Sequence, residues 1–423
     1  MSKILIINSY SWYNEGDAAI IIGTLHALRE HMPDAEITVL SMTPDVDREK
    51  YRKYDNRVQV LSNLLIPPVD YSKKLATALK YSFNIIKYTS IAKLHTIKNL
   101  ADQTLRAYVN TDLVISCGGD YIGGYQLGYL APFYGMYLAK LLGKPVIVWA
   151  QSAEPFGNVV IEKVNRFVLD KVDVIITRDN LSADYLEHLA LQTPVCRGAD
   201  AGYLFTGLPP EQGERLLADE EVYKNTEDLR VGVSAREWVF PQCRRGERMR
   251  RADNYLSVIV ETIKWLISEL NARVVVIPFC AVTPPEDDRV ISKRLANAVG
   301  SDRVTLLTRD YSPEELRAMI GHMDLFIGTR LHSNIFSTSM YVPTIAISYK
   351  KKTDGMMALL GMGDYVLDIN ALRLEDMISK IEGALANKME IKEILTHRVA
   401  QAKKLALDSA RLAQVILSEQ TKT

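Results

Sequence analysis

Short runs of β-branched residues alternate with longer amphipathic stretches along most of the chain, and this alternation restricts the folds available to it. Each run is followed by a plausible helix, the first over about residues 17–31. In the N-terminal half the runs are KILIINSY, AEITVLS at 35–41, DLVISCGG at 112–119, PVIVWAQS at 145–152 and DVIITRD at 173–179. Strands that alternate with helices form parallel sheets with helices on both faces, so the sequence predicts an α/β fold.

The alternation stops after residue 207 and restarts at residue 229, which predicts two domains. Residues 208–228 are polar and charged and contain two prolines, and strand-like runs resume with LRVGVSA. A chain of 423 residues is also long for a single core. We therefore assign residues 1–207 to an N-terminal domain, 208–228 to a linker, 229–385 to a C-terminal domain and 386–423 to a helical tail.

Composition argues against several classes of protein. The chain has 51 basic and 51 acidic residues, so no overall field attracts nucleic acid and any anion must be bound by a local cluster. Its four cysteines form no CxxC or Cys/His ligand spacing, so we expect no metal site and no disulfide framework, which fits a protein of the reducing cytoplasm. We also expect no cofactor. The N-terminal apolar run is too short for a signal peptide, and no apolar run is long enough to span a membrane.

One segment, residues 71–109, interrupts the alternation. It contains six lysines and one arginine against a single acid, Asp102, interleaved with Leu, Ile, Phe and Tyr. A basic amphipathic helix of this kind can lie on an anionic membrane surface. The alternative is an ordinary solvated face on a packed insertion.

Polar residues just after the predicted strands are candidates for a site, because open parallel sheets bind ligands beyond the carboxyl ends of their strands. The N-terminal domain offers two such places, and neither matches a dinucleotide loop or a P-loop. Asp17 either caps the following helix or accepts a proton or a sugar hydroxyl. The glycines around Asp120 allow a ligand to approach the backbone. The two sets are Asn14, Gly16 and Asp17, and Gly118, Gly119 and Asp120.

The C-terminal domain is predicted to bind an anion. In GTRLHSNIFS at 328–337, Arg330 and His332 flank a helix start, where free amides and the helix dipole favour negative charge. A histidine beside a bound anion readily gains a proton, which suits a general acid. Arg236 ends the strand at 229–235, and its guanidinium suits carboxylate and phosphate.

The sequence YSPEEL at 311–316 predicts a further helix start. Ser312 is placed as N-cap, Pro313 as the first helical residue and Glu315 as the residue that closes a capping box.

In these motifs the chain resembles the polysaccharide pyruvyl transferase family, and most closely its colanic-acid type. The match rests on five pieces spread in order over nearly the whole chain: N-x-G-D at 14–17, the glycine turn at 118–119, RDxxS at 178–182, GTRLHS at 328–333, and Tyr349 followed three residues later by Lys352. The resemblance implies two Rossmann-like domains facing a cleft, similar to the GT-B glycosyltransferase architecture.

The reaction that the resemblance implies is transfer of the pyruvyl group of phosphoenolpyruvate to two hydroxyls of one hexose, with release of phosphate. The product is a cyclic ketal. The acceptor would be a cell-surface polysaccharide or its lipid-linked precursor, which would give segment 71–109 a purpose at the inner face of the membrane.

Each candidate residue then has an expected role. His332 is the expected acid, and Asp17, or else Asp120, the expected base. The donor's two anionic groups are held by Arg330 and Arg236, with Lys352 assisting. The remaining binding residues are Asn14, Gly16, Gly118, Gly119 and Ser333.

Two other functions are compatible with the same architecture. A nucleotide-sugar glycosyltransferase would need an acidic ribose-binding residue late in the second domain, where the sequence offers no strong candidate. A non-catalytic saccharide-binding subunit would leave the pairing of Arg330 with His332 unexplained.

Overall fold

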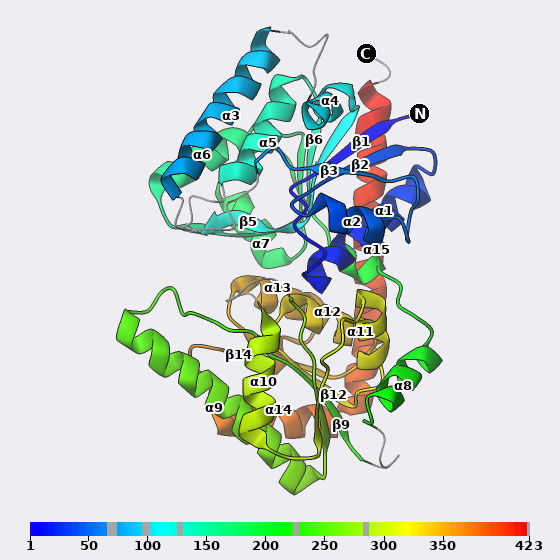
Figure 1. Ribbon diagram of the computed structural model, residues 1–423, viewed down its shortest axis with the longest axis vertical. Helices are drawn as coiled ribbons and strands as arrows, with labels where there is room; N and C mark the ends of the chain where they lie inside the picture. Colours follow the sequence, from blue (N-terminus) through cyan, green and yellow to red (C-terminus); the bar gives the residue numbers. More distant parts are fainter. Residues whose placement is uncertain (66–73, 95–101, 125–129, 223–227, 282–286, 421–423) are drawn as a thin grey trace. The chain divides into compact units, whose positions relative to one another are not determined.

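The computed structural model describes residues 1–65, 74–94, 102–124, 130–222, 228–281 and 287–420 (Figure 1). Within these residues the chain forms two compact units. Unit 1 contains residues 1–12, 20–204 and 403–423, and unit 2 contains residues 13–19 and 205–402.

Unit 1 is built on a parallel sheet of eight strands in the order β3-β2-β1-β4-β6-β7-β8, with β5 paired to β6. The strands are β1 (Lys3–Ile7), β2 (Glu36–Ser41), β3 (Gln59–Ser62), β4 (Leu113–Ser116), β5 (Gly119–Gly124), β6 (Val146–Phe156), β7 (Val174–Thr177) and β8 (Val195–Arg197). The helices are α1 (Glu15–His31), which begins in unit 2, then α2 (Pro44–Tyr51), α3 (Lys74–Leu94), α4 (Gln103–Asn110), α5 (Leu130–Leu141), α6 (Val159–Leu169) and α7 (Asn180–His188), followed by a short 3₁₀ helix, Ala201–Leu204.

Unit 2 is built on a parallel sheet of six strands in the order β11-β10-β9-β12-β13-β14. The strands are β9 (Arg230–Ser234), β10 (Arg273–Val276), β11 (Val304–Leu306), β12 (Leu325–Gly328), β13 (Thr344–Ser348) and β14 (Val366–Asp368). The helices are α8 (Pro210–Asp219), α9 (Arg245–Leu270), α10 (Asp288–Val299), α11 (Pro313–Ile320), α12 (Leu331–Ser339), α13 (Lys351–Leu359), α14 (Leu374–Ala386) and α15 (Lys388–Gln420), whose last residues belong to unit 1, with a short 3₁₀ helix, Gly363–Tyr365.

Both sheets follow the Rossmann pattern, in which the chain starts in the middle of the sheet and reverses direction once. Taken by their order along the chain, the unit 2 strands read 3-2-1-4-5-6. Their near-continuous apolar runs are buried, as in β12 and β13, because helices cover both faces of a parallel sheet. The predicted α/β class with two Rossmann-like domains is confirmed.

The units differ from the expected division of the chain in three places. Residues 13–19 belong to unit 2, because Glu15 N donates to Phe279 O at 3.2 Å and Ala281 N donates to Tyr13 O at 2.8 Å. Helix α8 lies within the expected linker and packs closely on α11, where a side chain at Gly213 would meet the backbone of Ala318. The tail helix α15 ends in unit 1.

The described part of the basic insertion is packed on unit 1. Asp102, its single acid, caps α4 by accepting from Thr104 N and Leu105 N, both at 3.0 Å, and also accepts from Tyr88 Oη at 3.0 Å. Tyr88 and Leu105 are buried together with Ala92 and Leu138. Residues 71–73 and 95–101 of the insertion lie outside the described part.

The RDxxS motif forms a buried polar network that follows β7. Asp179 caps α7 by accepting from Ser182 N at 2.8 Å, and it also accepts from Ser152 Oγ and Ser182 Oγ. Arg178 donates to Ser152 Oγ and pairs with Asp200, each at 2.8 Å. Burial acts to lower the pKa of Arg178, but neighbouring carboxylates, Asp200 first, raise it above its ordinary value.

We predict that Asp200→Ala lowers the free energy of unfolding by about 3 to 5 kcal/mol, because it leaves the buried Arg178 cation without its carboxylate. The matched control is Asp184→Ala, which removes one partner of the exposed Arg197 and should cost about 1 kcal/mol or less. Urea unfolding of both variants measures the difference. Equal costs would show that the buried pair contributes no more than the exposed one.

Candidate active site

The site is centred on the point in unit 2 where the strand order reverses, between β9 and β12. These strands are neighbours, with Ser234 opposite Gly328, and Thr329 N donates to Ser234 O at 2.8 Å. Their carboxyl ends continue into the segments that carry Arg236 and Arg330. Ligands of open α/β sheets bind at such a reversal point.

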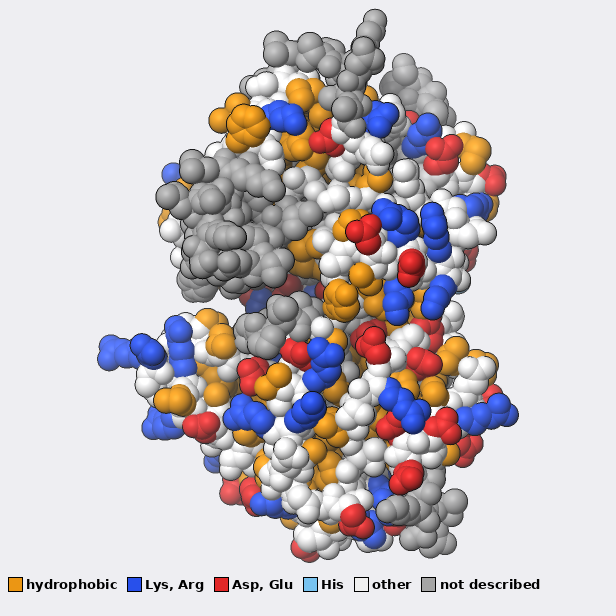
Figure 2. Space-filling view, viewed as in Figure 1, with side chains coloured by type: hydrophobic (Ala, Val, Ile, Leu, Met, Phe, Trp, Pro, Cys, Tyr) orange, Lys and Arg blue, Asp and Glu red, His pale blue; other side chains and the backbone are white. Residues whose placement is uncertain are grey.

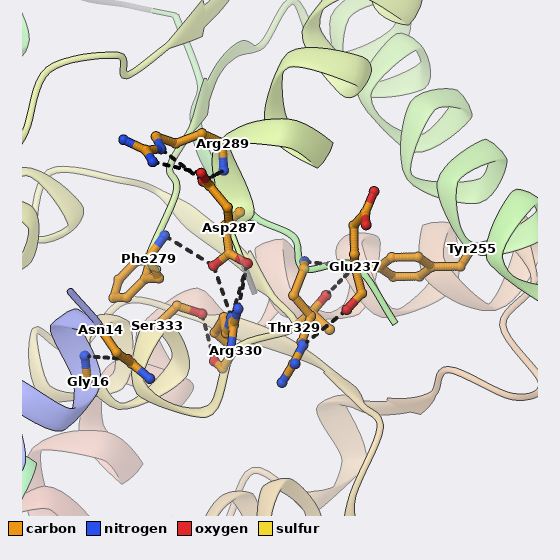
Figure 3. Close-up of polar contacts among 12 residues, drawn as sticks. Asn14, Gly16, Glu237, Tyr255, Phe279, Asp287, Arg289, Thr329, Arg330 and Ser333 are labelled. Carbon is orange, nitrogen blue, oxygen red and sulfur yellow. Dashed lines mark hydrogen bonds and ion pairs between the residues drawn. The ribbon is translucent and has the colours of Figure 1, made fainter. Parts of the chain in front are cut away.

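Arg330 is held by a buried carboxylate that the sequence analysis did not identify. It is the N-terminal flanking residue of α12, and its Nε and Nη2 donate to Asp288 at 2.9 and 2.7 Å. Asp288 also accepts from Phe279 N at 3.3 Å. Figure 3 shows Phe279 and Arg330 in this part of unit 2, together with Thr329 and Ser333. Arg330 is therefore fixed in orientation at the head of the helix.

The two charges affect each other strongly because both are buried. Burial acts to lower the pKa of Arg330, but the Asp288 carboxylate raises it, and the resulting pKa lies well above the ordinary value. Burial raises the pKa of Asp288, and Arg330 acts in the opposite direction. Arg330 is therefore a cation at physiological pH.

Arg236 lies against two aromatic rings. Its guanidinium carbon is 4.6 Å from the ring centroid of Tyr349 and 5.3 Å from that of Trp238, and the two rings are 4.6 Å apart. The Lys352 ammonium lies 5.5 Å from the Tyr349 ring. Cation–π contacts of this kind orient a guanidinium while leaving its N–H groups at the edge.

A buried hydroxyl connects the Arg236 segment to the end of β12. Tyr255 Oη accepts from Arg236 N at 3.4 Å and pairs with Thr329 Oγ1 at 2.8 Å. Burial raises the pKa of Tyr255 to about 12, so it stays a neutral phenol at physiological pH.

The N-x-G-D motif belongs to the same unit as these cations. Asn14 Oδ1 accepts from Gly16 N at 3.1 Å and so caps α1, and an isolated bridge joins Asn14 to Cys280. A methyl group at Gly16 would lie 2.1 to 2.6 Å from Nδ1, Cγ and Cβ of His332. Gly16 is therefore required for the close approach of the imidazole, and the half-buried Asp17 is the next residue along the helix.

The structure thus separates the predicted site residues into two groups. Unit 2 contains Asn14, Gly16, Asp17, Arg236, Arg330, His332, Ser333 and Lys352. Ser333 Oγ donates to Arg330 O at 2.7 Å, within the first turn of α12. Gly118, Gly119 and Asp120 belong to unit 1, where Asp120 is one of the carboxylates that raise the pKa of Arg178.

Asp288 and Trp238 are the site residues that sequence reasoning missed. Asp288 lies in an ordinary acidic stretch, and its partner Arg330 is 42 positions away. The only available signal was that a buried arginine at a helix start needs a carboxylate. Among the residues that the structure describes, no group of three or more His, Cys, Asp or Glu side chains could hold a metal ion.

Comparisons with known proteins agree on family and fold. Residues 14–351 match the family model described as polysaccharide pyruvyl transferase. The "Amylovoran biosynthesis protein AmsJ" of Erwinia amylovora is 25% identical over 410 residues, which cover 94% of this chain and 96% of that protein.

Similar solved structures include HepE of Anabaena in complex with UDP and glucose, with a TM-score of 0.60 and 13% identity over 99% of this chain and 100% of the other. The UDP-GlcNAc 2-epimerase of Methanocaldococcus jannaschii has a TM-score of 0.57 and 13% identity over 91% and 93% of the two chains. At these identities the likeness shows the fold, which is of the GT-B type.

We predict that Gly16→Ala displaces the His332 ring and destabilises the protein by about 1 to 3 kcal/mol, because the added carbon overlaps the imidazole. NMR of the histidine ring protons, with the His332 signal assigned through His332→Ala, measures the displacement. The control is Gly383→Ala in α14, where an added carbon has no neighbouring atom within 4 Å beyond its own stretch of helix. An unchanged His332 signal in Gly16→Ala would contradict the contact.

Proposed function

The chain belongs to the polysaccharide pyruvyl transferase family, and from this premise we propose that it transfers the pyruvyl group of phosphoenolpyruvate to two hydroxyls of a hexose. The product is a cyclic ketal on a cell-surface polysaccharide or its lipid-linked precursor, and phosphate is released. Family membership makes the protein a transferase of polysaccharide biosynthesis. The donor, the ketal and the identity of the acceptor are the proposal.

The observation that carries the proposal is the group of oriented cations at the reversal point of the unit 2 sheet. Phosphoenolpyruvate carries a carboxylate and a phosphate on one carbon, so its binding site needs two cationic groups at fixed separation. Arg330 is fixed by Asp288 and Arg236 by two aromatic rings. Guanidinium groups form charge-assisted hydrogen bonds with both carboxylate and phosphate, and the first amides of α12 add favourable dipoles. Lys352 assists.

His332 is the proposed acid. A protonated imidazole would give its proton to the methylene carbon of the donor, which turns the neighbouring carbon into an electrophile. The first sugar hydroxyl attacks that carbon and loses its proton. The carbon–oxygen bond to phosphate then breaks, and the second hydroxyl attacks the same carbon. The two sugar hydroxyls lose two protons in all. One replaces the proton that His332 gave to the carbon that becomes the methyl group, and the other leaves on the hydrogen phosphate.

Asp17 is the proposed base for the sugar hydroxyl. The Gly16 contact brings the start of α1 against His332, and Asp17 is half-buried in the first turn of that helix. Asp120, with Gly118 and Gly119, is the second candidate, on unit 1. Because phosphoenolpyruvate is a cytoplasmic metabolite, we place the reaction in the cytoplasm.

The tests below also distinguish two other functions. Solved structures of the same fold carry UDP or UDP-glucose, so a nucleotide sugar is the competing donor. A saccharide-binding subunit would bind acceptor without releasing phosphate. The arrangement of Arg330, His332 and Arg236 favours the small dianionic donor.

We predict that phosphoenolpyruvate raises the melting temperature of the protein and that UDP-sugars do not. A ligand at 100 times its Kd stabilises the folded state by about 2.7 kcal/mol. The shift should disappear in Arg330→Lys, which keeps a cation opposite Asp288 but lacks the planar guanidinium that can contact Asp288 and the donor at the same time. It should persist in the matched control Arg289→Lys, because Arg289 is an exposed arginine that pairs with Asp287. A shift with UDP-sugars alone would reject this donor.

We predict that His332→Ala lowers turnover by about 10²- to 10⁴-fold, the usual contribution of an acid catalyst, while the Kd for phosphoenolpyruvate changes little. Phosphate release with a saccharide acceptor measures turnover, and the donor-induced melting shift measures binding. His397→Ala, at an exposed position of α15, is the control. Near-normal turnover of His332→Ala would refute its role as the acid.

A further inference from the structure

Helix α6 has two apolar faces, although it lies on the surface of unit 1. Ile161, Val168 and Leu169 are buried on its inner face. On its outer face Val160, Val164 and Phe167 are 68%, 43% and 54% exposed, and Val159 beside them is 66% exposed. A surface helix normally presents polar residues to water, and a contiguous exposed apolar stripe on a monomer indicates a binding surface.

Helices α3 and α6 both pack on α5, so their exposed residues belong to one side of unit 1. Tyr134 of α5 contacts α3, since its Oη donates to Ile85 O at 3.2 Å and lies 3.3 Å from Thr89 Oγ1. Tyr137, one turn later, contacts α6 through Phe167, with ring centroids 5.8 Å apart. Figure 1 shows the three helices together on one side of the sheet.

The α3 helix adds exposed apolar residues to this side. Phe83 and Ile86 are 68% and 66% exposed, although the opposite side of the same helix is buried through Tyr88 and Ala92. We define the α3–α6 surface as Phe83, Ile86, Val160, Val164 and Phe167.

Positive charge accompanies the α3–α6 surface. The α3 sequence contains four lysines and no acid, and its Lys87 is exposed. On α6 Lys163 is exposed, and the following Lys171 lies 4.6 Å from the Phe167 ring centroid. The one acid of α6, Glu162, is paired with Arg166. Elsewhere the charges are mixed: Figure 2 shows Lys and Arg interspersed with Asp and Glu over much of the face in view.

We infer that the α3–α6 surface binds a lipid bilayer that contains anionic lipid. Apolar side chains on a helix face flanked by lysines are the pattern of helices that lie in the membrane interface, with the apolar residues among the acyl chains and the lysines at the headgroups. A second copy of the chain fits less well, because self-association would place lysines against lysines. Within the part of the chain that the structure describes, every helix is too short or too polar to cross a bilayer, so the contact is peripheral.

The inference extends the expected contact of segment 71–109 to α6, which the sequence did not single out. It does not depend on the proposed reaction. It would bring the enzyme to the same surface as a lipid-linked acceptor.

The test is flotation of the full-length protein with vesicles of phosphatidylcholine alone or mixed with phosphatidylglycerol. The variant Val160→Gln/Val164→Gln/Phe167→Gln should bind the mixed vesicles at least about tenfold more weakly, because full burial of even one such apolar side chain contributes about that factor. The control Val290→Gln/Met389→Gln/Val415→Gln changes exposed apolar residues elsewhere and should bind like the natural protein. Lys87→Glu/Lys163→Glu should weaken binding to the mixed vesicles most at low salt.

Three results would overturn the inference. They are failure of the natural protein to bind mixed vesicles, equal binding by both triple variants, and a dimer in sedimentation that dissociates only in the α6 variant. The donor-induced melting shift and circular dichroism of each variant show that it is folded. Because α6 is not in the proposed active site, the two proposals can fail separately. Loss of vesicle binding with an unchanged donor-induced melting shift would contradict only the membrane surface. Vesicle binding without a donor-induced shift would contradict only the proposed function.

Discussion

The buried pair of Asp288 and Arg330 is the interaction on which the geometry of the candidate site depends. Asp288 is the first residue of α10, accepts from the backbone N–H of Phe279 after β10, and accepts from Nε and Nη2 of Arg330 at the start of α12. A buried charge without a partner costs several kcal/mol, so neither residue can move without the other. One carboxylate thereby fixes the segment after β10 and the starts of α10 and α12 relative to one another.

The second constraint is the absence of a side chain at Gly16. Backbone hydrogen bonds from residues 13–15 to Phe279 and Ala281 attach the N-x-G-D motif to unit 2, and the missing Cβ lets His332 lie against the start of α1. A short segment from near the N-terminus therefore completes a site whose other residues come more than 200 positions later. The N-x-G-D motif and the GTRLHS motif, which the sequence analysis assigned to different domains, lie in the same unit.

Local signals predicted much of this fold and tertiary contacts decided the rest. The strands were predictable because parallel strands buried on both faces are apolar throughout, and the capping box at Ser312 and Glu315 formed as its sequence indicated. The assignment of residues 13–19 to unit 2 was not predictable, because it depends on backbone hydrogen bonds to a strand end about 265 positions away, which no side-chain pattern records. Asp288 was missed because its role also depends on a distant contact. An acid in a charged stretch can be identified as a site residue only when the arginine that pairs with it in the folded protein is known.

The two units each bury an arginine–aspartate pair after a strand, and position in the sheet distinguishes them. In unit 1 Arg178 follows β7, which is not at the reversal of strand order, and its neighbours Ser152, Asp179 and Ser182 bond to one another in a closed network. In unit 2 Arg330 follows β12 at the reversal, beside a second arginine that is oriented by aromatic rings. In the described part of the chain no side chain caps the start of α12, whereas Asp179 caps the start of α7. The same ion pair therefore stabilises the fold in unit 1 and orients a cation at the candidate site in unit 2.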